Sequence, residues 1–253
     1  MLGLGKSRST WNWVAHGKHP CARDYVTIGR DDALSQAFSG WMDKGYEAMG
    51  AAIKKDNMAH SWRFWAKPPK GDLLVVGIVR DSCDAIGRPY PLMMIGTGSI
   101  PEWQNRWHLL PYACNGTWTQ MEQLAARRYE DTSRFRDELG NIGPPQPDWK
   151  SYDQEINQVV EKATRDSAMD RIKKTVASLV DLAEFIVPMD TPGFDSVFSL
   201  LSLWHTVIKA KYSRSPSAVF MGGTSTHTYL AAYGRALSVG DFATLWSVQN
   251  KEE

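Results

Sequence analysis

The sequence predicts an α/β protein, a three-layer α/β/α sandwich in which helices cover both faces of a central mixed sheet. Residues 73–79 (LLVVGIV) and 91–95 (PLMMI) are continuous apolar runs of strand length, a pattern typical of strands that are buried on both faces. Segments with an apolar residue every three or four positions precede and follow these runs, as amphipathic helices do. Together these observations place a buried sheet between layers of helix.

Short segments of high strand propensity are predicted to form the sheet. Residues 61–67 (SWRFWAK) alternate in polarity and are followed by PPKG, a turn sequence, and then by the first apolar run. This arrangement predicts a β-hairpin. We expect strands near residues 12–16, 62–67, 72–80, 90–96 and 217–221.

Helices are expected before, between and after these strands. Residues 31–49 carry an apolar stripe at helical spacing, and Asp31 or Asp32 is placed to cap the first turn. The other helices are expected at 116–139, at 151–187 as one or two helices, at about 192–212 after Thr191 and Pro192, and as two short helices after residue 223.

The chain of 253 residues is long enough for one large domain or two small ones. We expect a single domain over 1–253, with a motif-rich half at about 1–100 and a helical half at about 101–253. The stretch GNIGPPQPDW is rich in glycine and proline, and such composition favours a linker. A flexible segment is therefore expected at 140–149.

Charge and cysteine content exclude several classes of protein. The chain has 29 Lys and Arg against 28 Asp and Glu, without a basic block, which argues against a nucleic-acid partner. Its apolar runs are much shorter than the ~20 residues of a membrane span. Cys21, Cys83 and Cys114 are widely spaced and odd in number, as expected of free thiols. We expect a cytoplasmic protein without membrane insertion, whereas the oligomeric state stays open.

Motifs for catalysis or cofactor binding are weak. His16, His19, Cys21 and Asp24 lie close in sequence but lack the paired spacing of a zinc site, and we expect no metal and no cofactor. Ser82 or Cys83 could serve as a nucleophile with one of the histidines at 16, 19 or 60, although no nucleophile elbow surrounds them. We expect no catalytic residues; a hydrolase or transferase that uses Ser82 or Cys83 with a nearby histidine is the alternative.

Polar residues gather between the two apolar runs. We name Asp24, Ser82, Asp84 and Arg88 the polar corner. Arg88 precedes a buried strand, and a guanidinium there is suited to pair with a carboxylate, for which we expect Asp24 or Asp84. A structural ion pair and a binding site are both compatible with this composition.

Four segments follow one another along the chain: WNWVAHGKHPCARDYV, a helix that carries Trp41, SWRFW and VRDSCDAIGRPYPLMM. This order of motifs resembles the TagF (ImpM) family, which is associated with the bacterial type VI secretion system. The ending SAVFMGG…GRALSVGDFATLW is also similar to that of the family. His19, Arg23 and Tyr25 depart from the usual family residues, which are leucine, glycine and phenylalanine. The positions that carry the resemblance are Gly17, Lys18, Pro20, Asp24, Tyr25, Trp62, Arg63, Phe64, Ser82, Asp84, Gly87, Arg88 and Pro91.

The resemblance implies a function that the motif search did not supply. It implies a non-enzymatic accessory or regulatory protein of the cytoplasm, a post-translational repressor of secretion-system assembly. It also implies a protein partner, a forkhead-associated scaffold protein of the same system, and a three-layer α/β fold.

Overall fold

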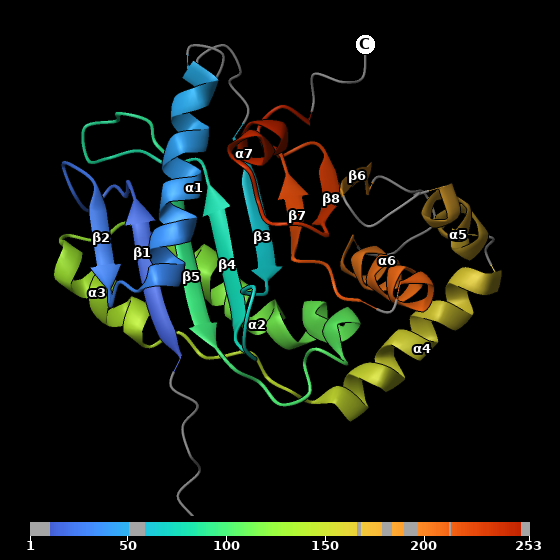
Figure 1. Ribbon diagram of the computed structural model, residues 1–253. Helices are drawn as coiled ribbons and strands as arrows, with labels where there is room; N and C mark the ends of the chain where they lie inside the picture. The colour runs from blue at the N-terminus through green and yellow to red at the C-terminus, as the bar shows by residue number, and fades with distance from the viewer. Residues whose placement is uncertain are drawn as a thin grey trace, which may run out of the picture.

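The computed structural model describes residues 11–50, 59–165, 168–178, 184–189, 197–212 and 214–248. These residues form one eight-stranded sheet in the order β2-β1-β5-β4-β3-β7-β8-β6, with α1 crossing one face (Figure 1). The strands are β1 Asn12–Gly17, β2 Val26–Gly29, β3 Ser61–Ala66, β4 Leu74–Arg80, β5 Leu92–Gly98, β6 Glu184–Pro188, β7 Ala218–Gly223 and β8 Thr228–Tyr233.

All pairs of neighbouring strands in this sheet are antiparallel, so the prediction of a mixed sheet is wrong. The apolar runs indicate that the strands are buried on both faces. Burial on both faces does not determine whether neighbouring strands run parallel or antiparallel. The five predicted strands are confirmed as β1, β3, β4, β5 and β7, and β3 and β4 form the expected hairpin. The strands β2, β6 and β8 were not predicted.

The first helix begins as expected. Asp32 caps it, and its Oδ1 accepts hydrogen bonds from the backbone N–H groups of Leu34 (3.0 Å) and Ser35 (2.8 Å). The described helices are α1 Ala33–Met49, α2 Leu110–Ala126, α3 Thr132–Gly140, α4 Trp149–Arg165, α5 Ala168–Ser178, α6 Val197–Lys211 and α7 Val239–Leu245, with a 3₁₀ turn, η2, at Trp107–Leu109.

Several predicted helices differ from the observed ones. The helix expected at 116–139 is two helices, because Asp131 caps α3 and accepts from the backbone N–H of Ser133 (2.8 Å). The region 151–187 holds α4, α5 and then strand β6, and the region after 223 holds strand β8 before α7. The helix start expected at Thr191 and Pro192 lies outside the described residues.

The segment between α3 and α4 is hydrogen-bonded to α2. The backbone N–H of Gly143 donates to Gln120 Oε1 (2.9 Å), and that of Gln146 donates to the carbonyl of Ala113 (2.9 Å). The flexibility of 140–149 stays a prediction. Among the helices of the described ranges, none combines the length and the apolar character needed to cross a bilayer.

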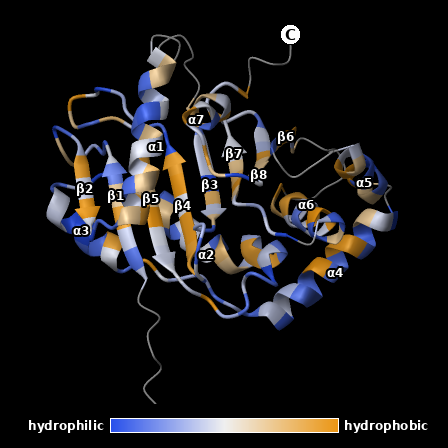
Figure 2. Ribbon diagram, viewed as in Figure 1, coloured by the Kyte–Doolittle hydropathy of each residue, from blue (hydrophilic) through white to orange (hydrophobic). Residues whose placement is uncertain are grey.

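Two apolar clusters lie on opposite faces of the sheet. One contains Phe64 and Phe220 of the strands with Phe38 of α1 and Phe242 of α7; the other joins the alternate strand residues to the inner sides of α2, α5 and α6. Figure 1 shows α2 and α3 behind the sheet, and Figure 2 shows that β4 is hydrophobic while α4 alternates between hydrophobic and hydrophilic residues. The three-layer arrangement is our interpretation of these contacts.

Candidate functional site

Two loops that are distant in sequence meet at one edge of the sheet. They are residues 18–25, between β1 and β2, and residues 81–91, between β4 and β5; we call them the loop pair. The two loops start at the same height of the sheet, because Gly17 at the end of β1 and Arg80 at the end of β4 both pair with Leu92 of β5. The backbone N–H of Ala85 then donates to the carbonyl of Ala22 (2.7 Å). The loop pair is therefore a joined surface.

Asp84 lies at the centre of the loop pair and its side chain is fully buried. Its Oδ1 accepts hydrogen bonds from the backbone N–H groups of Ile86 (3.1 Å) and Arg88 (2.9 Å). Its Oδ2 lies 2.6 Å from Arg88 Nε and 3.1 Å from Lys18 Nζ. The carboxylate thus fixes both loops from the inside, with two cations against one anion.

These contacts determine the charge state of Asp84. Burial disfavours the ionised carboxyl, but hydrogen bonds from the backbone and side chain of Arg88 and from Lys18 outweigh burial and hold the pKa of Asp84 well below its usual range. The carboxyl is therefore ionised at neutral pH. Lys18, whose side chain is also buried, has this carboxylate as its counter-charge.

The polar corner is brought together only in part. The predicted contact between Arg88 and Asp84 is present, and Arg88 Nη2 also donates to the carbonyl of Arg23. Asp24 takes a different position: it is exposed, and its carboxylate accepts from the backbone N–H of Tyr25 (2.8 Å). Ser82 contributes its backbone carbonyl, which accepts from the N–H of Tyr90 (3.0 Å). Whether the corner serves structure or recognition stays a prediction.

Each loop of the loop pair exposes one large apolar side chain. Tyr25 is 53% exposed and Ile86 is 63% exposed; we call this region the Tyr25–Ile86 surface. The ring of Tyr25 meets Tyr90 edge to face, with centroids 4.7 Å apart, and Lys18 Nζ lies 5.1 Å from its centroid. Tyr25 is thus exposed and yet held in one orientation.

A hydrogen-bond network joins the loop pair to α1. Tyr90 donates to Asp43 Oδ1 (2.5 Å), and His16 Nε2 lies 3.1 Å from the same oxygen. Burial opposes ionisation of Asp43, but the hydrogen bonds from His16 and Tyr90 outweigh it, so the pKa of Asp43 is lowered. Burial and the neighbouring carboxylate raise the pKa of Tyr90, which keeps the phenol protonated as a donor. Sequence analysis missed this network because 47 positions separate Asp43 from Tyr90.

The described residues give no support to a nucleophile at Ser82 or Cys83, since no hydrogen bond there joins either side chain to a histidine. His60 is buried, with its Nδ1 3.3 Å from Asp81 Oδ2. The other oxygen of that carboxylate accepts from Trp246 Nε1 (2.8 Å). This network therefore ties the strand ends to the chain that follows α7.

The remaining histidines of the N-terminal region also have other partners. His19 is buried and stacked on Phe135, with ring centroids 4.5 Å apart, and its Nδ1 accepts from the backbone N–H of Cys21 (3.1 Å). Burial lowers the pKa of His19, so it is neutral at pH 7. Within the described ranges, no three histidine, cysteine or carboxylate side chains are grouped as a metal site requires.

Other positions that carry the resemblance support the fold directly. Trp62 and Phe64 are fully buried in the core, and between them Arg63 binds Glu122 of α2 through Nε and Nη2 (2.7 Å each). Gly17 has φ 120°, and a Cβ there would lie 2.0 Å from the carbonyl oxygen of Pro91. Such a position admits only glycine.

Comparison with known proteins identifies a family and a fold. Residues 14–142 match the family model described as "TagF N-terminal domain, Type VI secretion system-associated". The crystal structure of PA0076 from Pseudomonas aeruginosa PAO1 is similar, with a TM-score of 0.54 and 16% identity over 92% of this chain and 93% of that one. At this identity the likeness shows the fold alone. A search of curated proteins found no match.

Proposed function

The chain belongs to the TagF N-terminal domain family, which is type VI secretion system-associated, and from this premise we propose that it regulates that system as a non-enzymatic binding protein. It acts in the cytoplasm as a post-translational repressor, and it prevents assembly of the secretion system by binding a protein partner. The partner is a forkhead-associated scaffold protein of the secretion system. The whole chain works as one domain in this proposal.

The Tyr25–Ile86 surface is the observation that carries the proposal. Large aromatic and aliphatic side chains in the centre of an interface supply most of its binding energy, and here they are exposed at 53% and 63%. Polar and charged side chains at Arg23, Asp24 and Arg88 lie beside them on the same loops. An apolar centre with a polar rim is the usual anatomy of a protein interface.

The buried contacts beneath this surface favour the same function. Asp84 fixes the loop that carries Ile86, and Lys18 and Tyr90 fix the ring of Tyr25. A surface that is ordered before it meets its partner loses less conformational entropy on binding. The polar corner therefore serves recognition indirectly, through the rigidity that it gives to the loop pair.

Substitution at this surface is expected to weaken binding without unfolding the protein. Tyr25→Ala and Ile86→Asp should each reduce affinity for the scaffold protein at least about tenfold, since each removes an anchor. Their melting temperatures should stay near the wild-type value because both side chains are exposed. Leu73→Ala is the matched control, an apolar side chain that is 42% exposed on another edge of the molecule. Calorimetric titration with purified scaffold protein measures the affinities.

A secretion assay in cells that compares the two surface variants with Ser82→Ala and Cys83→Ala distinguishes binding from catalysis. Ser82→Ala and Cys83→Ala should leave repression of effector secretion intact, whereas Tyr25→Ala and Ile86→Asp should relieve it. Effector secretion and the abundance of each variant are measured together. Loss of repression in an abundant, folded Ser82→Ala or Cys83→Ala variant would contradict the non-enzymatic proposal. Repression that survives both surface substitutions would contradict the assigned surface.

A further inference from the structure

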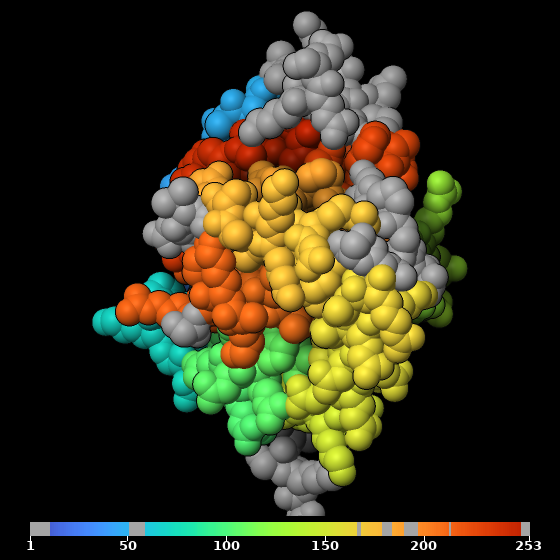
Figure 3. All heavy atoms as spheres, turned by 90° about the vertical axis from the view of Figure 1, so that its right-hand side faces the viewer, coloured from blue at the N-terminus to red at the C-terminus, as the bar shows by residue number. Residues whose placement is uncertain are grey.

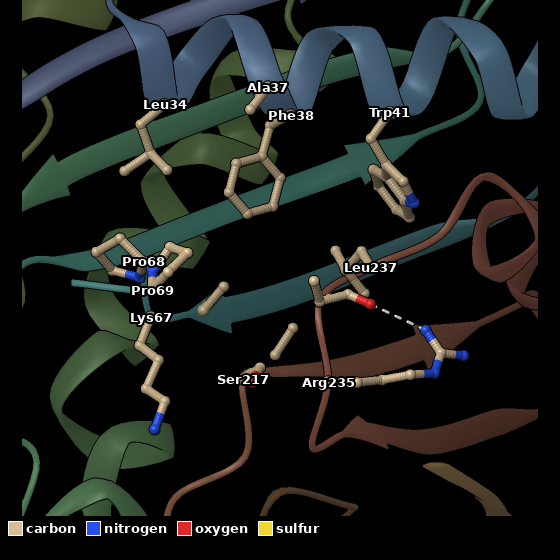
Figure 4. A pocket seen from close by; sticks show the side chains of 13 residues that line it. Leu34, Ala37, Phe38, Trp41, Lys67, Pro68, Pro69, Ser217, Arg235 and Leu237 are labelled. Atoms are coloured by element: carbon tan, nitrogen blue, oxygen red, sulfur yellow. Dashed lines mark hydrogen bonds between the residues drawn. The ribbon is translucent and has the colours of Figure 1, made fainter. Parts of the chain in front are cut away.

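A groove of about 330 Å³ runs along the N-terminal half of α1, on the face of the sheet that α7 also covers. Figure 4 shows side chains from α1 above it and from the ends of β3 and β8 below it. We call it the α1 groove. Its apolar lining includes Leu34, Phe38, Trp41, Pro68, Pro69 and Leu237.

The walls of the α1 groove are held in place by the surrounding structure. Phe38 stacks on Phe64 of the core, with centroids 5.5 Å apart, and Trp41 Nε1 donates to the carbonyl of Ser238 (2.8 Å). On the opposite wall, the backbone N–H of Lys67 donates to the carbonyl of Ser217 (2.9 Å). The groove is therefore preformed, and a ligand need not order it.

Among the described residues, those that line the groove carry charges of one sign. Lys67 and Arg235 are its charged lining residues, and none of the described lining residues has a carboxylate. Arg235 is compensated, because its guanidinium binds both oxygens of Asp241 (2.7 and 2.8 Å) and also pairs with Glu184.

Lys67 differs from Arg235 in its partners. Its Nζ donates to the side-chain oxygen of Ser215 (3.1 Å) and lies 3.4 Å from the carbonyl of that residue, and within the described residues no carboxylate pairs with it. Figure 3 shows the turn after β3, in cyan, projecting beside the orange segment that leads into β7. Figure 4 shows the side chain of Lys67 leading away from Phe38 and Trp41, so its ammonium group lies outside the apolar lining. Such a groove is complementary to a ligand whose carboxylate lies beyond its apolar side chains.

We propose that the α1 groove receives a short segment of the protein partner that presents bulky apolar side chains next to an acidic residue. The apolar side chains occupy the space between Phe38, Trp41 and Leu237, and the carboxylate pairs with Lys67. This proposal rests on the proposed function and adds to it, because the groove shares no lining residue with the Tyr25–Ile86 surface. Two separate contacts on one partner raise the overall affinity through effective concentration.

The test follows Trp41 by fluorine NMR in full-length protein labelled with 5-fluorotryptophan. Its resonance is assigned as the one that is missing in Trp41→Phe. The probes are two capped hexapeptides that differ at one position, one with a Leu-Phe-Glu core and one with a Leu-Phe-Gln core. We expect both to shift the Trp41 resonance, and the glutamate peptide to bind about fivefold more tightly, as for an exposed ion pair.

Matched variants locate the binding. Lys67→Gln should abolish the preference for the glutamate peptide, whereas Lys70→Gln, at an exposed lysine on the same turn outside the lining, should keep it. Ala37→Phe should fill the groove and abolish the shift. Ala33→Phe, at an exposed position of the same helix outside the lining, should not.

Several results would overturn the proposal. They are a Trp41 resonance that neither peptide moves, a preference for glutamate that survives Lys67→Gln, and a shift that depends on protein concentration alone, which would assign the groove to a second copy of this chain. Calorimetry with the scaffold protein separates the two proposals. If the scaffold protein binds and the Trp41 resonance does not move, the groove proposal is wrong and the proposed function stands. If the peptides bind and the scaffold protein does not, the proposed function is wrong and the groove remains a peptide site.

Discussion

Asp84→Ala is expected to lower the melting temperature by about 10 °C at pH 7, since removal of one partner of a buried ion pair is strongly destabilising. The substitution leaves the ammonium group of Lys18 buried without its counter-charge and removes the acceptor of two backbone N–H groups. Asp24→Ala is the matched control, because that carboxylate is exposed on the same loop pair. Thermal unfolding followed by circular dichroism measures both.

The two cations around Asp84 should differ in their effects. The side chain of Lys18 is 7% exposed and that of Arg88 is 53% exposed, so Arg88→Ala should lower the melting temperature much less than Asp84→Ala.

The pKa of Asp84 is lowered in the folded protein. Its stabilisation is therefore complete above the unfolded value of 3.8 and is lost only as the pH falls through the lower folded value. A melting temperature for Asp84→Ala equal to that of Asp24→Ala would contradict the central role of this carboxylate.

A fall in pH from 7 to 5 is expected to lower the free energy of unfolding by about 2 kcal/mol through His205 alone. This histidine is buried in α6, where Nδ1 lies 2.8 Å from the carbonyl of Leu201 and Trp65 Nε1 donates to Nε2 (3.3 Å). Burial lowers its pKa from 6.5 to about 4. The unfolded chain therefore binds the proton first. The stabilisation is complete above pH 6.5 and is lost as the pH falls toward 4.

Urea denaturation at pH 7 and pH 5 checks this expectation. His205→Gln keeps a neutral acceptor for Trp65 but cannot be protonated, so it should remove a large part of the pH dependence. The rest remains because burial and the nearby Lys209 lower the pKa of His108 to about 4, and burial also lowers the pKa of His19. An unchanged pH dependence in His205→Gln would show that other groups cause the acid destabilisation.

The strands that sequence analysis found and missed differ in how much local information they carry. β4 and β5 contain most of the apolar runs 73–79 and 91–95, and a buried strand of this kind can be predicted without knowledge of its neighbours. β2 has four residues, VTIG, in a context of proline, glycine and charge, and it is a strand because it pairs with β1. β8, TYLAAY, contains good helix formers, and its pairing with β7 and β6 decides its structure.

In the candidate site, too, local sequence predicts contacts between near neighbours and not those between distant segments. The contact between Arg88 and Asp84 was predictable because four positions separate the two residues. The contacts of Lys18 with Asp84 and of Tyr90 with Asp43 join segments that only the sheet brings together. Lys18 has a place in the family pattern, but its burial beside a carboxylate has no signature in local sequence. Charge pairs between distant segments depend on topology, which composition and periodicity do not encode.

The position of β7 beside β3 has a consequence for how the protein is made. β3 pairs with β4 on one side and with β7 on the other, and about 150 residues separate β3 from β7. While the chain emerges from the ribosome, β3 keeps an open edge with apolar side chains until residues 218–223 have been synthesised. An open edge of this kind invites aggregation. A fragment that ends at residue 142, where the family match ends, would keep that edge permanently, so production of this region by itself is expected to yield aggregates rather than a folded module.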